Sequence, residues 1–147
     1  MRSWYELENA DEVPSPGLLI FPDRVRKNLL RMVDWAGADR LRPHVKTHKL
    51  PQIIQMKLDV GITKFKVATI AEAEMTAATG GRDVFVAYQM AGPNRQRLID
   101  LMLKFPATKF STLADDPAVV RALSAEAIRR DIQLDVFVDL NVGMNRT

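Results

Sequence analysis

Five basic side chains fall within eight consecutive residues of this 147-residue chain, and no carboxylate lies among them. They are Arg42, His44, Lys46, His48 and Lys49. A lysine held among cations loses part of its preference for the protonated form, so its amine becomes more available as a nucleophile toward a carbonyl. The same cluster would attract a phosphate group. The segment is therefore a candidate site for a ligand that carries a carbonyl, a phosphate or both.

A strand that delivers its last side chains into a pocket is the element expected to position this cluster. The segment follows a helical stretch, and a new helix is expected to begin at Leu50-Pro51. Side chains alternate along a strand. The pattern therefore predicts one face made by Arg42, His44, Lys46 and His48, with Val45 and Thr47 on the other.

Two other interpretations of the same residues were weighed. A run of like charges is most often a solvated loop. His44 and His48 stand four residues apart, as a helical pair of metal ligands would. However, Pro43 disfavours a helix there, and no glutamate follows His44 to complete a metalloprotease motif, so a metal site is not expected at this segment.

Composition limits the classes of protein to which this chain can belong. With 47% hydrophobic residues, 147 residues suffice for one core and suggest a single domain. The 21 basic and 18 acidic residues are interspersed and leave a net charge of only +3, so no nucleic-acid partner is expected. The absence of cysteine excludes disulfides and fits a reducing compartment. No apolar run has transmembrane length, so we expect a cytoplasmic protein that does not engage a membrane.

Strand and helix patterns alternate along the rest of the chain. Besides the basic segment, apolar runs predict strands at 17–21, 64–69, 83–89, 109–113 and 133–142. Capping residues and apolar periodicity predict helices that begin near Pro22, Pro51, Ile70, Asn94 and Pro117. Such alternation is typical of right-handed βαβ units around a parallel sheet.

The expected fold is therefore α/β, as a parallel β/α barrel of the TIM type. No glycine-rich dinucleotide fingerprint follows a strand, which disfavours a Rossmann site. A complete barrel needs eight units and about 250 residues. The sequence offers at most six strands, so an incomplete barrel is expected, after an irregular lead-in over residues 1–16.

The segment Arg42-Pro43-His44-Val45-Lys46-Thr47-His48-Lys49 strongly resembles the cofactor-lysine segment of D-threonine aldolases and eukaryotic-type D-serine dehydratases. Those enzymes belong to the fold-type III pyridoxal-phosphate group, which shares the alanine racemase N-terminal barrel. Weaker matches follow the family's order along the chain: residues 16–20, 71–74 and 143–146. The resemblance implies that residues 17–147 are the N-terminal part of such a barrel, truncated before its last units and a C-terminal β domain.

The resemblance also implies roles for individual residues. Lys46 would form a Schiff base with pyridoxal 5′-phosphate, and Arg146 would lie beside the cofactor ring. His44 and His48 would tune the pocket or touch the cofactor. Gln89 and Asp139 stand at strand ends and are further candidates, although strand-end polar residues often only satisfy neighbouring groups.

The implied activity is retro-aldol cleavage of a D-threonine-type amino acid to glycine and an aldehyde. Dehydration of D-serine to pyruvate and ammonia is the alternative. Racemization is weaker, because Asp139 stands where the racemases have a lysine, seven residues before Arg146. A non-catalytic pyridoxal-phosphate carrier and a β/α module that binds another anion also stay open.

The family further implies a divalent metal, Mn or Zn, held by a C-terminal histidine paired with aspartate or cysteine, and a homodimer. The cofactor phosphate would be bound by later barrel loops. Neither region belongs to this sequence, so we expect the 147-residue chain by itself to be inactive or nearly so.

Overall fold

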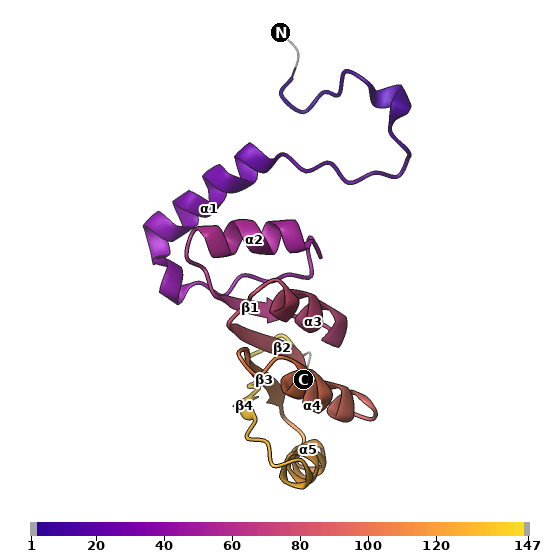
Figure 1. Ribbon diagram of the computed structural model, residues 1–147, viewed down its shortest axis with the longest axis vertical. Coiled ribbons are helices and arrows are strands. Elements are labelled where there is room, and N and C mark those ends of the chain that lie inside the picture. The colour runs from indigo at the N-terminus through magenta and orange to yellow at the C-terminus, as the bar shows by residue number, and fades with distance from the viewer. Residues whose placement is uncertain (1–2, 146–147) are drawn as a thin grey trace.

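The structure is a computed structural model, described here for residues 3–145, in which helices and strands alternate (Figure 1). An irregular lead-in contains a short 3-10 helix, η1, and precedes the first α-helix. The elements of the described part are η1 (Ala10–Glu12), α1 (Pro22–Ala36), η2 (Ala38–Arg40), α2 (Pro51–Asp59), β1 (Lys64–Val67), α3 (Ile70–Ala78), β2 (Asp83–Gln89), α4 (Asn94–Lys104), β3 (Lys109–Ala114), α5 (Pro117–Arg129) and β4 (Asp135–Val138).

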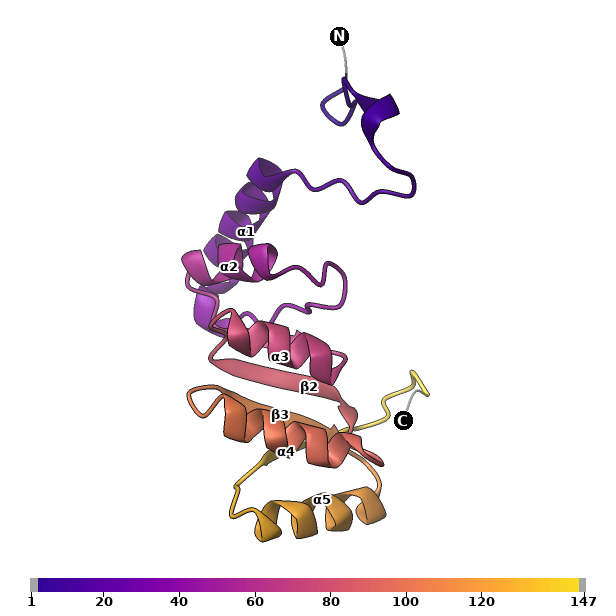
Figure 2. The ribbon, with the colours of Figure 1, turned by 45° about the vertical axis from the view of Figure 1, so that its right-hand side comes forward.

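The strands form one parallel sheet in the order β1-β2-β3-β4. Consecutive strands are neighbours, so each helix between them is a crossover of the predicted βαβ type. Helices α3, α4 and α5 lie along one face of the sheet, as Figure 2 shows. The predicted α/β class with parallel strands is confirmed.

The core lies between the sheet and these helices. Alternate strand residues point toward the helices, and Phe65, Val67, Val84 and Val86 are all completely buried. The helices contribute the other half of the same cluster, through Ile70, Ala73, Ala77, Leu98, Leu101 and Leu123. Burial of this apolar surface is the main force that stabilises the sheet against its helices.

Helix starts follow the capping chemistry that the sequence predicts. The Thr69 hydroxyl accepts a hydrogen bond from the Glu72 N–H (3.1 Å), and the Asp116 carboxylate accepts one from the Ala118 N–H (2.6 Å). Proline occupies the first turn of α1, α2 and α5, where its missing N–H costs nothing. These caps fix where α3 and α5 leave the carboxyl ends of β1 and β3.

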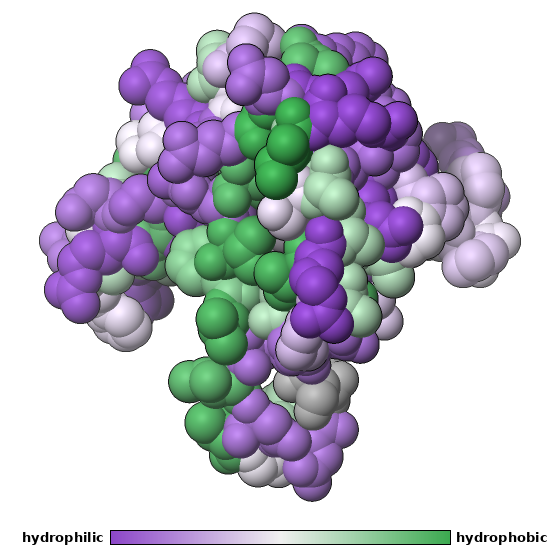
Figure 3. Space-filling view, turned by 90° about the horizontal axis from the view of Figure 1, so that it is seen from below, coloured by the Kyte–Doolittle hydropathy of each residue, from purple (hydrophilic) through white to green (hydrophobic). Residues whose placement is uncertain are grey.

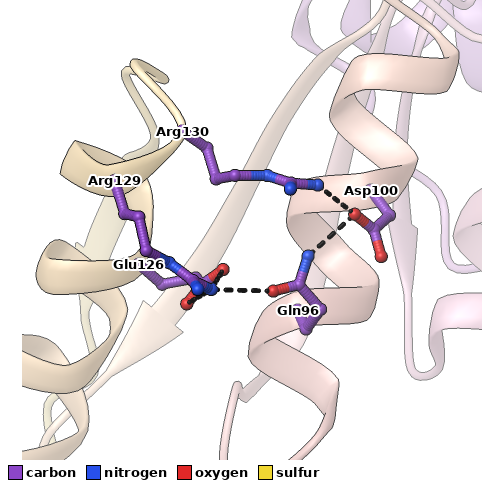
Figure 4. Close-up of polar contacts among 5 residues, drawn as sticks. All are labelled: Gln96, Asp100, Glu126, Arg129 and Arg130. Carbon is purple, nitrogen blue, oxygen red and sulfur yellow. Dashed lines mark hydrogen bonds and ion pairs between the residues drawn. The ribbon is translucent and has the colours of Figure 1, made fainter.

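Charged and amide side chains link α4 to α5 on the surface (Figure 4). Arg130 donates a hydrogen bond to Asp100 (2.7 Å), and Arg129 donates to Gln96 (3.2 Å) and to Glu126 of its own helix (2.5 Å). These groups are largely exposed, so the network orients the two helices more than it stabilises them.

Three strand predictions were wrong in part or whole. Residues 17–21 form no strand, and residues 17–20 make no backbone hydrogen bond to any described strand; Leu18 is 72% exposed. The basic segment contributes only one bridge, between His44 and Lys66, before it turns. The last strand ends at Val138 rather than at 142. In each case the local sequence pattern alone was insufficient, because a strand also needs a neighbour for its backbone groups.

Exposed apolar side chains gather at the β4 end of the sheet. Val136, Phe137, Val138, Leu140 and Val142 are between 42% and 90% exposed. Figure 3, seen from the side of the molecule where α5 and β4 lie, shows hydrophobic residues as a band bordered by polar ones. None of the helices in residues 3–145 is both long and apolar enough to cross a membrane.

Candidate functional site

Lys46 lies on a tight turn beside β1, the first strand of the sheet. Val45, completely buried, anchors the turn: its N–H donates to the Lys66 carbonyl of β1 at 2.8 Å. The Val45 carbonyl accepts the N–H groups of His48 (3.1 Å) and Lys49 (3.0 Å), which closes the chain on itself. The expected alternation of Lys46 and His48 on one strand face is therefore wrong, because the chain turns rather than extends.

The turn lies at the carboxyl edge of the parallel sheet. His44 pairs with Lys66 near the end of β1, Gln89 ends β2, and Asp139 directly follows β4. Figure 2 shows the loop that leads into α2 on the same side as the tip of β2 and the last described residues of the chain. Active sites of β/α barrels are assembled at this edge. Arg42 lies at the opposite edge, where its guanidinium holds Asp83 at the start of β2 through contacts of 2.6 and 2.7 Å.

The Lys46 side chain is exposed, and within residues 3–145 its ammonium group has no hydrogen-bond or ion-pair partner. Its backbone N–H donates to His44 Nδ1 at 3.2 Å. Lys49, three residues on, provides a contrast, since its Nζ lies 3.2 Å from Glu72 Oε1. The turn thus presents one engaged lysine and one that is available to a ligand.

Glu72 is a buried carboxylate, 4% exposed, directly behind the turn. Its Oε2 accepts the Ala68 N–H at 2.8 Å, while its Oε1 makes no hydrogen bond and only the ion pair with Lys49. The carboxylate therefore ties the lysine turn to the first turn of α3. We did not predict this role, although the spacing of Thr69 and Glu72 is that of a capping box and could have indicated it.

His48 points back toward α2. Its Nδ1 lies 3.1 Å from the Leu50 N–H, and its Nε2 lies 2.8 Å from Lys57 Nζ. Burial, and then the charge of Lys57, lower the pKa of His48 to about 4. Burial lowers the pKa of Lys57 to about 8. Lys57 was not predicted as a site residue. Its position on the same face of α2 as the apolar Ile53 and Ile54 could have indicated that this lysine is buried.

His44 faces the cations of the site. Partial burial first, and then the charges of Lys46 and Lys66, lower the pKa of its imidazole. The ring is therefore neutral at physiological pH, and its Nδ1 accepts the Lys46 N–H. His44 thus supports the turn through a neutral ring.

Gln89 and Asp139 occupy the predicted edge, where Gln89 lies against the loop after β3 and the Asp139 backbone continues the pairing with β3. Gln89 Oε1 lies 3.4 Å from the backbone nitrogens of both Asp115 and Asp116. The Asp139 N–H donates to the Ala114 carbonyl at 3.2 Å. Arg146 lies outside the described residues. The cofactor roles of these three residues, and of His44 and His48, stay predictions.

The side chain of Asn141 closes a turn over residues 141–145. Asn141 Oδ1 accepts the N–H groups of Gly143 and Asn145, both at 3.1 Å. Within the described chain, no three histidine or acidic side chains group as they would around a metal ion.

Comparison with known families identifies the family of this chain. Residues 20–147 match the alanine racemase N-terminal domain. The chain belongs to that family. A D-threonine aldolase from Arthrobacter is 29% identical over 91% of this chain, and a D-threo-3-hydroxyaspartate dehydratase from Delftia is 29% identical over 90%. The family assignment that the basic segment suggested is confirmed.

Solved structures agree with the sequence relatives. The crystal structure of D-threonine aldolase from Filomicrobium marinum superposes with a TM-score of 0.82 at 30% identity, over 92% of this chain. An H351A mutant of D-threo-3-hydroxyaspartate dehydratase gives 0.77 at 28% identity. The chain spans 35% of the length of the curated relatives above and 37% of the aldolase structure. It therefore has the fold of one part of a β/α barrel.

Proposed function

We propose that this chain supplies the lysine-bearing part of a pyridoxal-phosphate-dependent lyase that acts on D-β-hydroxy amino acids. The favoured reaction is retro-aldol cleavage of a D-threonine-type substrate to glycine and an aldehyde. The observation that carries the proposal is the exposed amine of Lys46 at the carboxyl edge of the sheet, which has no partner among residues 3–145, in a chain related to D-threonine aldolases.

The residues at this edge fit pyridoxal 5′-phosphate. An aldehyde requires a primary amine that no carboxylate engages, and Lys46 meets that condition among the described residues. The neighbouring cation Lys66 suits an anionic ligand. When bound, the cofactor supplies an electron sink for bonds broken at the substrate α-carbon.

The chain's own residues would hold the cofactor and move a proton. Lys46 Nζ would attach it covalently and, once released by the substrate amine, would act as a general base or acid. Val45 and Glu72 would keep the turn in place, because one is buried against β1 and the other ties Lys49 to α3. Arg146 is proposed to lie beside the cofactor ring, with Gln89 and Asp139 at the rim of the site.

Dehydration is the second candidate. It is favoured by one observation: the D-threo-3-hydroxyaspartate dehydratase is as similar to this chain, at 29% identity, as the D-threonine aldolase. Both reactions would begin from the same lysine, so the described residues do not separate them.

We further propose that the whole protein is a cytoplasmic homodimer that uses Mn or Zn, held by residues beyond this chain.

Cofactor binding provides the test. The chain is titrated with pyridoxal 5′-phosphate, and the visible absorption of the protein-bound imine is compared between the wild type and two lysine variants. Lys46→Ala should abolish the band. Lys27→Ala, which removes an exposed lysine of α1 outside the turn, should retain it.

An equal loss in both variants would contradict the proposal and favour a general anion site. Activity is assayed on the same samples with D-threonine and manganese, followed by glycine release. The chain by itself is expected to release none.

A further inference from the structure

The hydrogen bonds of His48 restrict where its proton can be. The Leu50 N–H is a donor, so His48 Nδ1 must present a lone pair at 3.1 Å. A neutral imidazole carries one proton, which must then be on Nε2. That proton points at Lys57 Nζ, only 2.8 Å away.

A contact of this kind requires Lys57 to accept a hydrogen bond. An ammonium group has three protons and no lone pair, whereas a neutral amine has one lone pair. If Lys57 is protonated, it must instead donate to Nε2. The ring proton then moves to Nδ1 and faces the Leu50 N–H, where two donors oppose each other. The two arrangements are mutually exclusive.

The surroundings of Lys57 ease the loss of its proton, so that the neutral amine predominates above about pH 8. Its side chain is 6% exposed on α2, and in the described chain no carboxylate forms an ion pair with it. A buried lysine without a counter-ion is costly to keep charged, and burial lowers the pKa of Lys57 to about 8. The charges that act on His48 are Lys57 from α2 and the carboxylate of Glu72 from α3.

The pair lies at the junction between the lysine turn and α2. Leu50, whose N–H reaches His48, is the residue that caps α2, and His48 lies near the downstream end of the turn that carries Lys46. The other end of the turn is fixed by Val45 against β1. His48 and Lys57 therefore hold the downstream end, together with the Lys49–Glu72 ion pair.

We propose that Lys57 is a positioning residue that acts through His48: as a neutral amine it accepts the His48 Nε2 proton, which fixes the ring against the Leu50 N–H and orients the turn of Lys46. The inference rests on the proposed function only where it concerns cofactor capture by Lys46. The arrangement of the pair can be measured without a cofactor.

The first experiment is nitrogen–proton correlation spectroscopy of the imidazole rings in the 147-residue chain between pH 6.5 and 10. The sequence has only two histidines, so a His44→Asn variant assigns the signals. We expect the His48 ring to become the Nε2-protonated tautomer with a midpoint near pH 8. In Lys57→Met this step should vanish, and in Lys57→Gln, whose amide oxygen accepts a hydrogen bond at every pH, the ring should stay in that tautomer throughout.

The second experiment is the rate at which pyridoxal 5′-phosphate and borohydride label Lys46 in the same variants. The ratio of the wild-type rate to the Lys57→Met rate should rise several-fold between pH 7 and pH 9, whereas the ratio to Lys57→Gln should approach one at pH 9. A wild-type His48 signal that shows no tautomer step, or spectra and rate ratios that are the same for Lys57→Met and wild type, would overturn the proposal.

The two proposals can fail separately. Absence of labelling at Lys46 at any pH would refute the proposed function, while the ring spectra would still decide whether Lys57 sets the His48 tautomer. If Lys57→Met does not fold, Lys57→Gln and the wild-type midpoint provide the decision.

Discussion

At the scale of single residues, the site depends on groups whose charge is changed by burial. Lys46 could be found from the sequence because its basic neighbours and its resemblance to a cofactor-lysine segment are both local features. Lys57 and Glu72 could not be found in the same way. Their roles arise where α2 and α3 meet the turn, eight or more residues away along the chain.

Lys57 should make stability depend on alkaline pH. Its pKa is about 8 in the folded chain against an ordinary value of 10.5, so between these values the unfolded chain binds more protons. The free energy of unfolding should therefore rise as pH increases from about 8 to 10.5, by an amount on the order of 3 kcal/mol. Chemical denaturation of wild type and Lys57→Met across this range checks it; equal pH slopes in the two proteins would contradict it.

His48 should also make the free energy of unfolding rise with pH, in the acidic range. Its folded pKa of about 4 lies below the ordinary 6.5, so the unfolded chain binds more protons in that window. Stability should fall as pH decreases from 6.5 to 4. Thermal unfolding of His48→Gln should show a shallower acid slope than wild type. The residual slope in that variant is expected from His44, whose pKa is lowered too.

At the scale of elements, helices were more predictable than strands. The helix Ile70–Ala78 and the strand Asp83–Gln89 occur at the predicted residues, because a cap or a long apolar run determines each locally. The segment 17–21 has the same apolar character, yet no strand forms. Pairing depends on which neighbour is present, and that information is not in the segment itself.

Gly81 marks a close approach between α3 and β1. A Cβ there would lie 2.8 Å from Thr76 Cγ2 and 3.2 Å from Phe65 Cδ2, two buried side chains. Gly81→Ala should therefore destabilise the chain by roughly 1–3 kcal/mol through overpacking. The midpoint of urea unfolding measures this.

Gly92→Ala is the matched control, because its Cβ would meet nothing within 4 Å. Its φ of +55° should cost only about 1 kcal/mol of backbone strain. A smaller loss for Gly81→Ala than for Gly92→Ala would contradict the packing argument.

At the scale of the whole molecule, the last strand of the sheet, β4, exposes apolar side chains, which is unusual for a protein surface. β4 is an edge strand within the described residues, and Val136, Phe137 and Val138 are exposed along it. An exposed apolar edge strand promotes association with other chains. The parallel order of the sheet was predictable from the alternation of elements, but the exposure of β4 required the structure.

Self-association should therefore depend on concentration and on β4. Val138→Lys places a charge on a side chain that is 75% exposed and should leave the fold intact while it weakens association. Leu30→Lys, on α1 and 53% exposed, is the control away from the edge strand. Sedimentation velocity over a range of concentrations should show a shift to smaller species for Val138→Lys alone; identical profiles for all three proteins would show that β4 does not mediate association.

The central claim concerns the amine at position 46, and trapping it chemically tests that claim most directly. The chain is incubated with one equivalent of pyridoxal 5′-phosphate, reduced with borohydride, digested and mapped by mass spectrometry. The account predicts one label per chain, on Lys46, with Lys49 unmodified because it is paired with Glu72. Label distributed over surface lysines such as Lys27, Lys104 and Lys109, with no preference for Lys46, would contradict it.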